Sequence, residues 1–184
     1  MKRRAAAAVM CVSIAAAGFA QKNMVAGGAG AYVNIPLVAG AEAWVSYERR
    51  IIPRLAVGVN LAGQFYPAAI FAIALTADSG KITNIFGYVA DAQARWYPFK
   101  GAFHLDAGLG LGDFLMSMPC LVITPGLGWK ITFGKSPVSL NIGIRGEFYA
   151  PLGDSVLRYE NTDGEWVDLW PFNLGGRVGL GVSF

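Results

Sequence analysis

The stretch Pro171-Phe172-Asn173-Leu174-Gly175-Gly176-Arg177-Val178-Gly179-Leu180-Gly181-Val182-Ser183-Phe184 alternates between two kinds of residue. One set of alternate positions is mostly apolar, and the other is polar or glycine. A period of two predicts a β-strand with one apolar face and one polar face of small residues. Phe184 then lies at the tip of a long amphipathic strand, a position that suits an aromatic ring at a membrane interface.

The same alternation recurs in seven earlier segments. The eight predicted strands are 28–35, 38–49, 55–65, 86–97, 103–112, 121–133, 138–149 and 172–184. The links after the second, fourth and sixth are short. Those after the third (67–82), the fifth (113–120) and the seventh (151–170) are longer, although the link after the first is also short. This alternation predicts an all-β fold: a transmembrane antiparallel up-and-down β-barrel of eight strands.

The first 20 residues have the pattern of a secretory signal peptide. Lys2, Arg3 and Arg4 precede an apolar run to Ala17, and small residues at 18 and 20 predict cleavage after Ala20. The run is too short for a spanning helix. Cleavage takes three of the 15 Lys and Arg residues and leaves 12 against 12 Asp and Glu. The mature chain, residues 21–184, is therefore neutral, which gives no support to nucleic-acid binding.

Charged residues within the predicted strands fall on the polar set of positions. They are Glu42, Glu48, Asp91, Arg95, Asp106, Lys130, Arg145, Glu147 and Arg177. If that face lines the lumen, these side chains form an internal network, since buried charges are tolerated when paired and hydrogen-bonded. One interpretation is a structural plug, because an eight-stranded barrel is about wide enough for its own side chains. The other is a gated polar path in which some pairs switch.

Parity alone does not decide which face points outward. A soluble lipocalin-like binder in the periplasm would place the apolar face inside. Three features favour the opposite arrangement: a glycine-rich polar face, few and nearly balanced charges, and aromatic residues near the strand ends. Those aromatics are Tyr47, Phe65, Trp96, Phe133, Phe148, Phe172 and Phe184.

The run from Arg95 to Gly110, with its Trp-Tyr-Pro-Phe turn, and the segment Pro125 to Lys130 resemble a known family. They are similar to small eight-stranded outer-membrane barrels of the outer membrane protein A, X and W type. The resemblance implies the outer membrane of a diderm bacterium, with outer-membrane lipid as a partner. It also implies that Phe184 is a C-terminal signal to the barrel-assembly machinery.

Two long links suggest different functions. An apolar mouth for a small hydrophobic solute is one interpretation of the link that contains Ile70, Phe71, Ile73 and Leu75. Extension of the flanking strands is the other. The link from Asp154 to Asp168 carries five acidic residues. It also has two aromatic residues, Tyr159 and Trp166, and a third, Trp170, follows it. It is a solvated face or a contact surface for an extracellular partner.

Catalytic and metal sites find no support in the sequence. His104 is the single histidine, and Cys120 is the single cysteine after cleavage, so neither a metal cluster nor a disulfide is expected. His104 shares its face with Asp106, and we expect a hydrogen-bonded lumen histidine. The sequence predicts a non-enzymatic, cofactor-free outer-membrane barrel, as a narrow or gated conduit for small or hydrophobic solutes. The alternative is a surface adhesion or structural barrel that acts through its loops.

Overall fold

A computed structural model of the chain describes residues 23–34, 38–66, 86–99, 102–114, 118–152, 158–160, 166–168 and 172–184. These residues form ten strands. They are β1 (Asn23–Asn34), β2 (Val38–Ile52), β3 (Leu55–Phe65), β4 (Phe86–Trp96), β5 (Phe103–Phe114), β6 (Met118–Thr132), β7 (Val138–Pro151), β8 (Arg158–Glu160), β9 (Trp166–Asp168) and β10 (Phe172–Ser183). No helix in the described part of the chain is long and apolar enough to cross a membrane.

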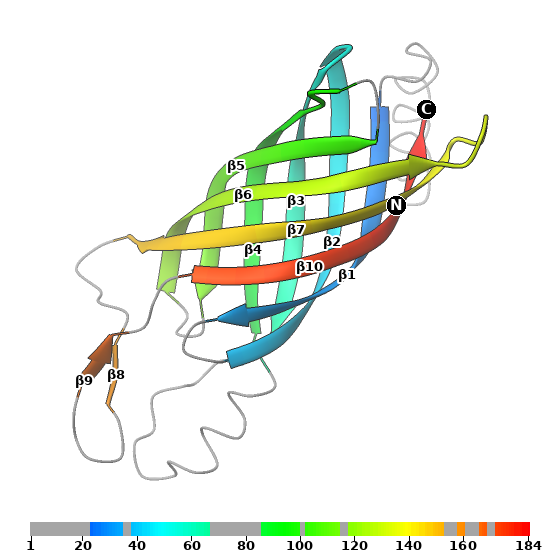
Figure 1. Cartoon of the computed structure of the whole chain (residues 1–184). Helices are drawn as coiled ribbons and strands as arrows, with labels where there is room; N and C mark the ends of the chain where they lie inside the picture. Colours follow the sequence, from blue (N-terminus) through cyan, green and yellow to red (C-terminus); the bar gives the residue numbers. More distant parts are fainter. Residues whose placement is uncertain are drawn as a thin grey trace, which may run out of the picture.

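Eight of the strands close into a barrel, in the order β1-β10-β7-β6-β5-β4-β3-β2. Every pairing is antiparallel, and β1 closes the barrel against β10 (Figure 1). At the seam, the Phe184 N–H donates to the Asn23 carbonyl at 2.9 Å, and the Asn23 N–H donates to the Phe184 carbonyl at 3.1 Å. The last strand therefore has no open edge, and the predicted all-β, eight-stranded antiparallel barrel is confirmed.

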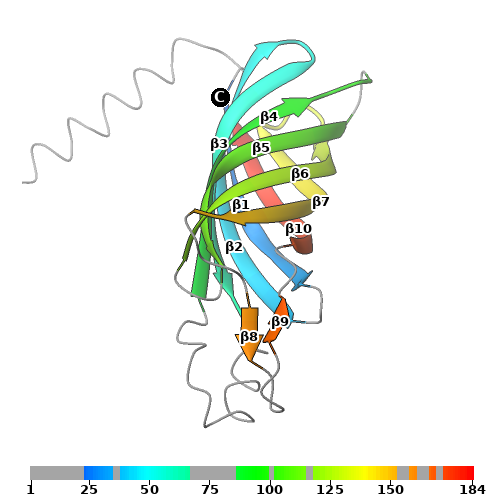
Figure 2. The same cartoon turned by 90° about the vertical axis from the view of Figure 1, so that its left-hand side faces the viewer.

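The barrel has two different ends. Residues 23 and 184 and the connections β2–β3, β4–β5 and β6–β7 lie at one end, which we call the turn end. The other connections lie at the opposite, loop end, and the strands run obliquely between the two ends (Figure 2). At the loop end, the β3–β4 and β7–β10 connections are long, whereas β1–β2 and β5–β6 are joined by three residues each.

Several predicted boundaries were wrong, and β2 continues to Ile52 rather than ending at Arg49. β1 begins at Asn23 rather than Gly28, because residues 23–27 pair with both β2 and β10. The predicted link 113–120 shrinks to 115–117, since β5 and β6 stay paired as far as Phe114 and Met118. The predicted link 151–170 contains a two-stranded sheet, β8 with β9. Backbone pairing extends strands through small or polar residues where side-chain alternation is weak.

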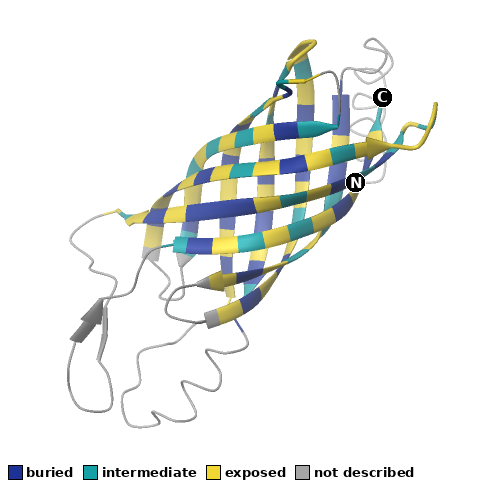
Figure 3. Cartoon of the chain, in the orientation of Figure 1, coloured by how far each residue is buried: buried dark blue, intermediate teal, exposed yellow. Residues whose placement is uncertain are grey.

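Burial alternates along the strands with a period of two (Figure 3). β4 shows the pattern most clearly, with its even-numbered residues exposed and most of its odd-numbered residues buried. The large apolar side chains that are exposed include Leu109, Ile123 and Leu180. Among the described residues of the barrel strands, the charged residues on the outward parity are Arg49, near the turn end, and Asp113, next to the last residue of β5. The wall is therefore apolar outside and polar inside.

Candidate functional site

The lumen holds two groups of interacting charges. The first, which we call the turn-side cluster, consists of Glu48, Arg95, Tyr97, His104 and Asp106. Arg95 donates from Nε and Nη2 to both Asp106 oxygens at 2.8 and 3.1 Å, and from Nη1 to Glu48 at 2.7 Å. His104 Nδ1 lies 3.0 Å from Asp106 Oδ1. One guanidinium thus links two carboxylates, in the bidentate geometry that is strongest for arginine.

Tyr97 lies just beyond the end of β4 and closes this cluster toward the turn end. Its hydroxyl donates to Glu48 Oε1 at 3.1 Å, and its ring lies edge-on to the His104 ring. Burial, and to a smaller extent the charge of Glu48, raise the pKa of Tyr97 to about 12 against the opposing effect of Arg95. The phenol therefore stays protonated and acts as a donor to Glu48 throughout the neutral range.

The second group, which we call the loop-side cluster, contains Glu42, Asp91, Arg145, Glu147 and Arg177. Arg145 pairs with Asp91 and with Glu147, the latter at 3.3 Å. Arg177 pairs with Glu42 through two nitrogens and lies 3.5 Å from Glu147. Both guanidiniums therefore share Glu147, which joins the two ion pairs into one network.

Three carboxylates face two guanidiniums in this cluster, so the ion pairs alone leave one negative charge over. Neutral donors compensate at Glu147 Oε2, which accepts hydrogen bonds from Gln64 at 2.5 Å, Tyr149 at 2.7 Å and Asn173 at 3.4 Å. These donors satisfy the second oxygen of a buried carboxylate. Asn60 ties the network together, because its amide donates to Asp91 and accepts from Arg177 Nη1.

Glycines set the distances between these charges. Gly30 is the register partner of Arg177 on β10 and of Glu42 on β2, so the two charged residues meet across a residue without a side chain. A Cβ at Gly30 would lie 2.6 Å from Glu42 Oε1. The glycine-rich polar face therefore supplies the room in which long charged side chains pair.

Gly108 gives a direct test of this packing. A Cβ built there would lie 2.3 Å from Thr124 Oγ1 and 2.6 Å from Asp91 Oδ1. We expect Gly108→Ala to lower the free energy of unfolding by about 1–3 kcal/mol through overpacking. Urea titration of the refolded barrel measures this. Gly63→Ala is the matched control, because no heavy atom of the described residues, apart from its chain neighbours, lies within 4 Å of a Cβ added at Gly63. Equal effects at both positions would show that the glycines do not provide the space in which the lumen charges pair.

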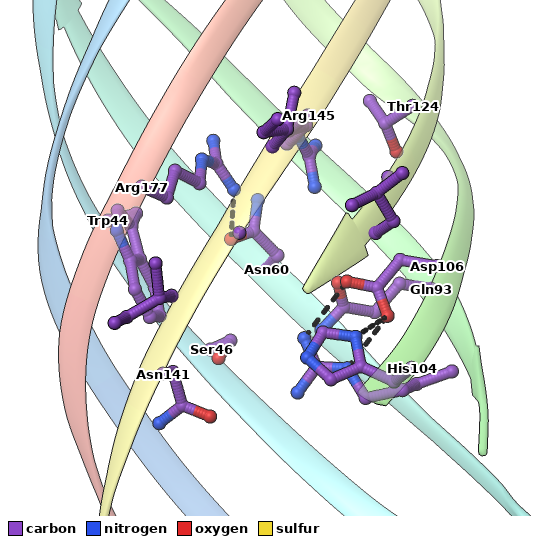
Figure 4. Close-up of a pocket in the computed structure, with 16 residues that line it drawn as sticks. Trp44, Ser46, Asn60, Gln93, His104, Asp106, Thr124, Asn141, Arg145 and Arg177 are labelled. Atoms are coloured by element: carbon purple, nitrogen blue, oxygen red, sulfur yellow. Dashed lines mark hydrogen bonds and ion pairs between the residues drawn. The ribbon is translucent and has the colours of Figure 1, made fainter. Parts of the chain in front are cut away.

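A small polar chamber lies between the two clusters (Figure 4). It has a volume of about 50 Å³, and its lining includes Trp44, Ser46, Gln93 and Asn141. Among the described residues, neither amide atom of Asn141 nor Trp44 Nε1 has a hydrogen-bond partner, although all three atoms are buried. A polar cavity of this size has room for roughly three waters. The lumen is therefore closed by ion pairs on both sides of a hydratable space.

The structure brings eight of the nine predicted lumen residues into these two clusters. Lys130 lies apart, at the mouth of the turn end. The neutral partners were not predicted as site residues. They include Asn60, Gln64, Tyr66, Thr124, Tyr149 and Asn173. They lie on the same alternate strand positions as the charged residues, so the sequence pattern could have indicated them. A search limited to charged residues missed them.

Other predicted features fall elsewhere. The signal peptide and the apolar mouth formed by Ile70, Phe71, Ile73 and Leu75 lie outside the described residues, as do most residues of the acidic link. Phe184 is partly exposed beside the β1–β10 seam. Within the described ranges, no group of three His, Cys, Asp or Glu residues could hold a metal ion.

Comparison with known proteins shows a fold and no family. No protein-family model matches the chain. No curated protein matches its sequence either. Among solved structures, the crystal structure of Neisserial surface protein A (NspA) is similar, with a TM-score of 0.51. The identity is 16%, and the alignment covers 88% of this chain and 96% of that one. The chain therefore shares a barrel fold with a Neisserial surface protein over 88% of its length.

Proposed function

We propose that the chain is a non-enzymatic, integral outer-membrane β-barrel protein that spans the bilayer with its eight barrel strands. The observation that carries this proposal is the outer wall. Its described residues are apolar across the middle of the barrel, and its two charged residues, Arg49 and Asp113, lie near the turn end and the loop end. Exposing such an apolar surface to water would cost free energy, whereas contact with the hydrocarbon of a bilayer avoids that cost. The strands have 11 to 15 residues, enough to cross at a tilt.

Aromatic residues at both ends of the wall support this placement. Trp96, Phe133 and Phe184 are exposed near the turn end, while Phe86 and Phe148 are exposed near the loop end. Aromatic rings at two levels match the two interfaces of a membrane. The likeness to a surface protein and the resemblance to the outer membrane protein A, X and W type both agree with this proposal. By analogy with such barrels, the turn end faces the periplasm.

For the lumen, we propose a narrow conduit that is closed at rest and opens by exchange of ion pairs. Glu147 lies 3.3 Å from Arg145 and 3.5 Å from Arg177, so it can change partner with little movement. The chamber between the clusters has room for a few waters and lies along the path that a solute would take through the lumen. A solute larger than a few waters requires that the clusters rearrange.

The second candidate function is surface adhesion through the loops. The observation that favours it is the β8–β9 pairing, which gives the long β7–β10 connection a two-stranded element of its own. Long loops on a rigid scaffold commonly carry binding function. On this proposal, the lumen clusters serve only to hold the barrel closed, and the partner is extracellular.

Heat-modifiability tests the membrane proposal. We expect residues 21–184, refolded in detergent, to give a β-type circular dichroism spectrum and to migrate differently in boiled and unboiled samples. Folding should require detergent or lipid, since the apolar wall needs a hydrocarbon environment. A chain that folds and stays dispersed without detergent would overturn the proposal. Bilayer conductance of the refolded protein then separates the conduit, which gives discrete openings, from the adhesion barrel, which gives none.

A further inference from the structure

The turn end of the lumen opens into a mouth of about 590 Å³. Its walls come from β1, β2, β6, the β6–β7 turn, the last residue of β10, and Tyr97 just after β4. Three basic residues line it: Arg50 near the end of β2, Lys130 near the end of β6, and Lys135 in the turn that follows. They come from different elements, so their charges converge on one space.

Glu48 is the one carboxylate in the lining of this mouth. Its charge is already engaged, because Arg95 Nη1 lies 2.7 Å from one oxygen and the Tyr97 hydroxyl donates to the other at 3.1 Å. Among described residues, neither Arg50, Lys130 nor Lys135 forms an ion pair within 4.0 Å. With Arg95 and its two carboxylate partners Glu48 and Asp106 included, four cations face two carboxylates, which leaves this end of the lumen with an excess of two positive charges.

The basic side chains stand on ordered backbone. The Arg50 guanidinium carbon lies 5.0 Å from the centre of the Tyr97 ring, and this stacking leaves the guanidinium edge available as a donor. The pairing of β2 with β3 shifts register between Arg50 and Ile52, a bulge of the kind that re-aims side chains. The Lys130 N–H donates to the Ala102 carbonyl at 2.8 Å.

The turn that carries Lys135 is also fixed. Gly134 adopts a positive φ of 59°, and the Ser136 N–H donates to the Phe133 carbonyl at 3.0 Å. The Val138 N–H donates to Ser136 Oγ at 3.1 Å. Ser136 and Thr132 add hydroxyl groups to the lining. The mouth therefore combines a guanidinium, two ammonium groups and neutral donors.

We propose that this mouth binds a phosphate-bearing anion. The excess of two positive charges matches a phosphate dianion, and a guanidinium fork with lysine point charges is the donor set that phosphate favours. The site does not depend on the membrane proposal, which only adds that the mouth faces the periplasm. The phosphate comes either from a free solute or from the headgroup of an anionic phospholipid.

Titration of the refolded barrel with inorganic phosphate tests this site, in zwitterionic detergent at low ionic strength and with isothermal calorimetry as the readout. We expect saturable binding at one site. Arg50→Gln and Lys130→Gln should each weaken the affinity by about tenfold or more, because each removes one charge-assisted hydrogen bond. Both variants should keep their heat-modifiable mobility, since neither residue belongs to the lumen clusters.

Arg54→Gln is the matched control. Arg54 carries the same charge in the exposed β2–β3 turn and does not line the mouth. Its variant should bind phosphate within about twofold of the unsubstituted barrel, because its exposed side chain does not line the mouth and its charge is screened by water and salt. The inference is overturned if the unsubstituted barrel shows no saturable binding, or if Arg54→Gln weakens binding as much as Lys130→Gln.

A competition arm distinguishes the two sources of phosphate. A short-chain phosphatidylglycerol is added to the phosphate-bound barrel in the same detergent. Displacement of inorganic phosphate identifies the headgroup as a ligand of the mouth, and retention identifies a free anion; both outcomes keep the phosphate site. Since heat-modifiability reports on the membrane proposal separately, failure of one proposal can be told from failure of the other.

Discussion

Arg145→Ala should destabilise the refolded barrel by about 3–5 kcal/mol, the typical effect of removing one partner of a buried ion pair. Arg145 pairs with Asp91, whose side chain is fully buried, and with Glu147. Without the guanidinium, Asp91 retains Asn60 and Thr124 as neutral partners but no cation. Burying a carboxylate without a cationic partner costs far more free energy than an intact ion pair contributes to stability.

Urea titration in detergent or lipid, with gel mobility and circular dichroism as probes, measures this loss. Arg54→Ala removes an equal charge from an exposed turn and should change stability by less than about 0.5 kcal/mol. Adding Asp91→Asn to Arg145→Ala should restore part of the loss, because it removes the orphaned charge. An Arg145→Ala barrel as stable as the Arg54→Ala barrel would show that the loop-side cluster does not hold the lumen together. We expect Glu147→Ala to act in the same direction.

Leu109→Arg should cost about 2–4 kcal/mol in a lipid bilayer, the penalty for arginine on the lipid face near the midplane of a transmembrane barrel. Leu109 lies in the middle of β5, is 56% exposed, and has Ala92 and Ile123 as its register partners. The described acidic residue of the barrel strands on this face, Asp113, lies four residues farther along β5, near the loop end. The guanidinium would therefore lie in hydrocarbon without a partner.

The control for Leu109→Arg is the same substitution near the turn end. Ile131 also faces outward but lies next to the last residue of β6, where lipid headgroups and water can reach an arginine. Ile131→Arg should cost about 0–1 kcal/mol, since the penalty falls toward the interfaces. Refolding into lipid vesicles with urea titration compares the two variants. If both are neutral, the outer wall does not face hydrocarbon, and the soluble barrel regains support.

The outer and inner faces were readable from the sequence because side chains on a strand alternate between two sides. Within their strands, Leu109 and Ile123 occupy the apolar set of alternate positions, and Asp91 and Arg145 occupy the polar set. This division does not depend on how the strands pair. The number of strands followed from the same alternation together with the turn residues between segments. The extension of β1 to Asn23 did not, because it places apolar Met24 and Ala26 on the inner parity and polar Asn23 on the outer one, against the alternation of the other strands.

The partners within the lumen were decided by the tertiary structure. Arg177 and Glu42 are 135 residues apart, and they meet because barrel closure places both in register with Gly30. Asp91 and Arg145 come from strands that are not neighbours and meet across the lumen. Sequence period sets only which face a side chain occupies, whereas its height and its opposite number depend on strand register and closure. The sequence by itself therefore determined a polar lumen inside an apolar wall. Tertiary pairing decided that this lumen has two ion-pair clusters, a chamber between them and a basic mouth.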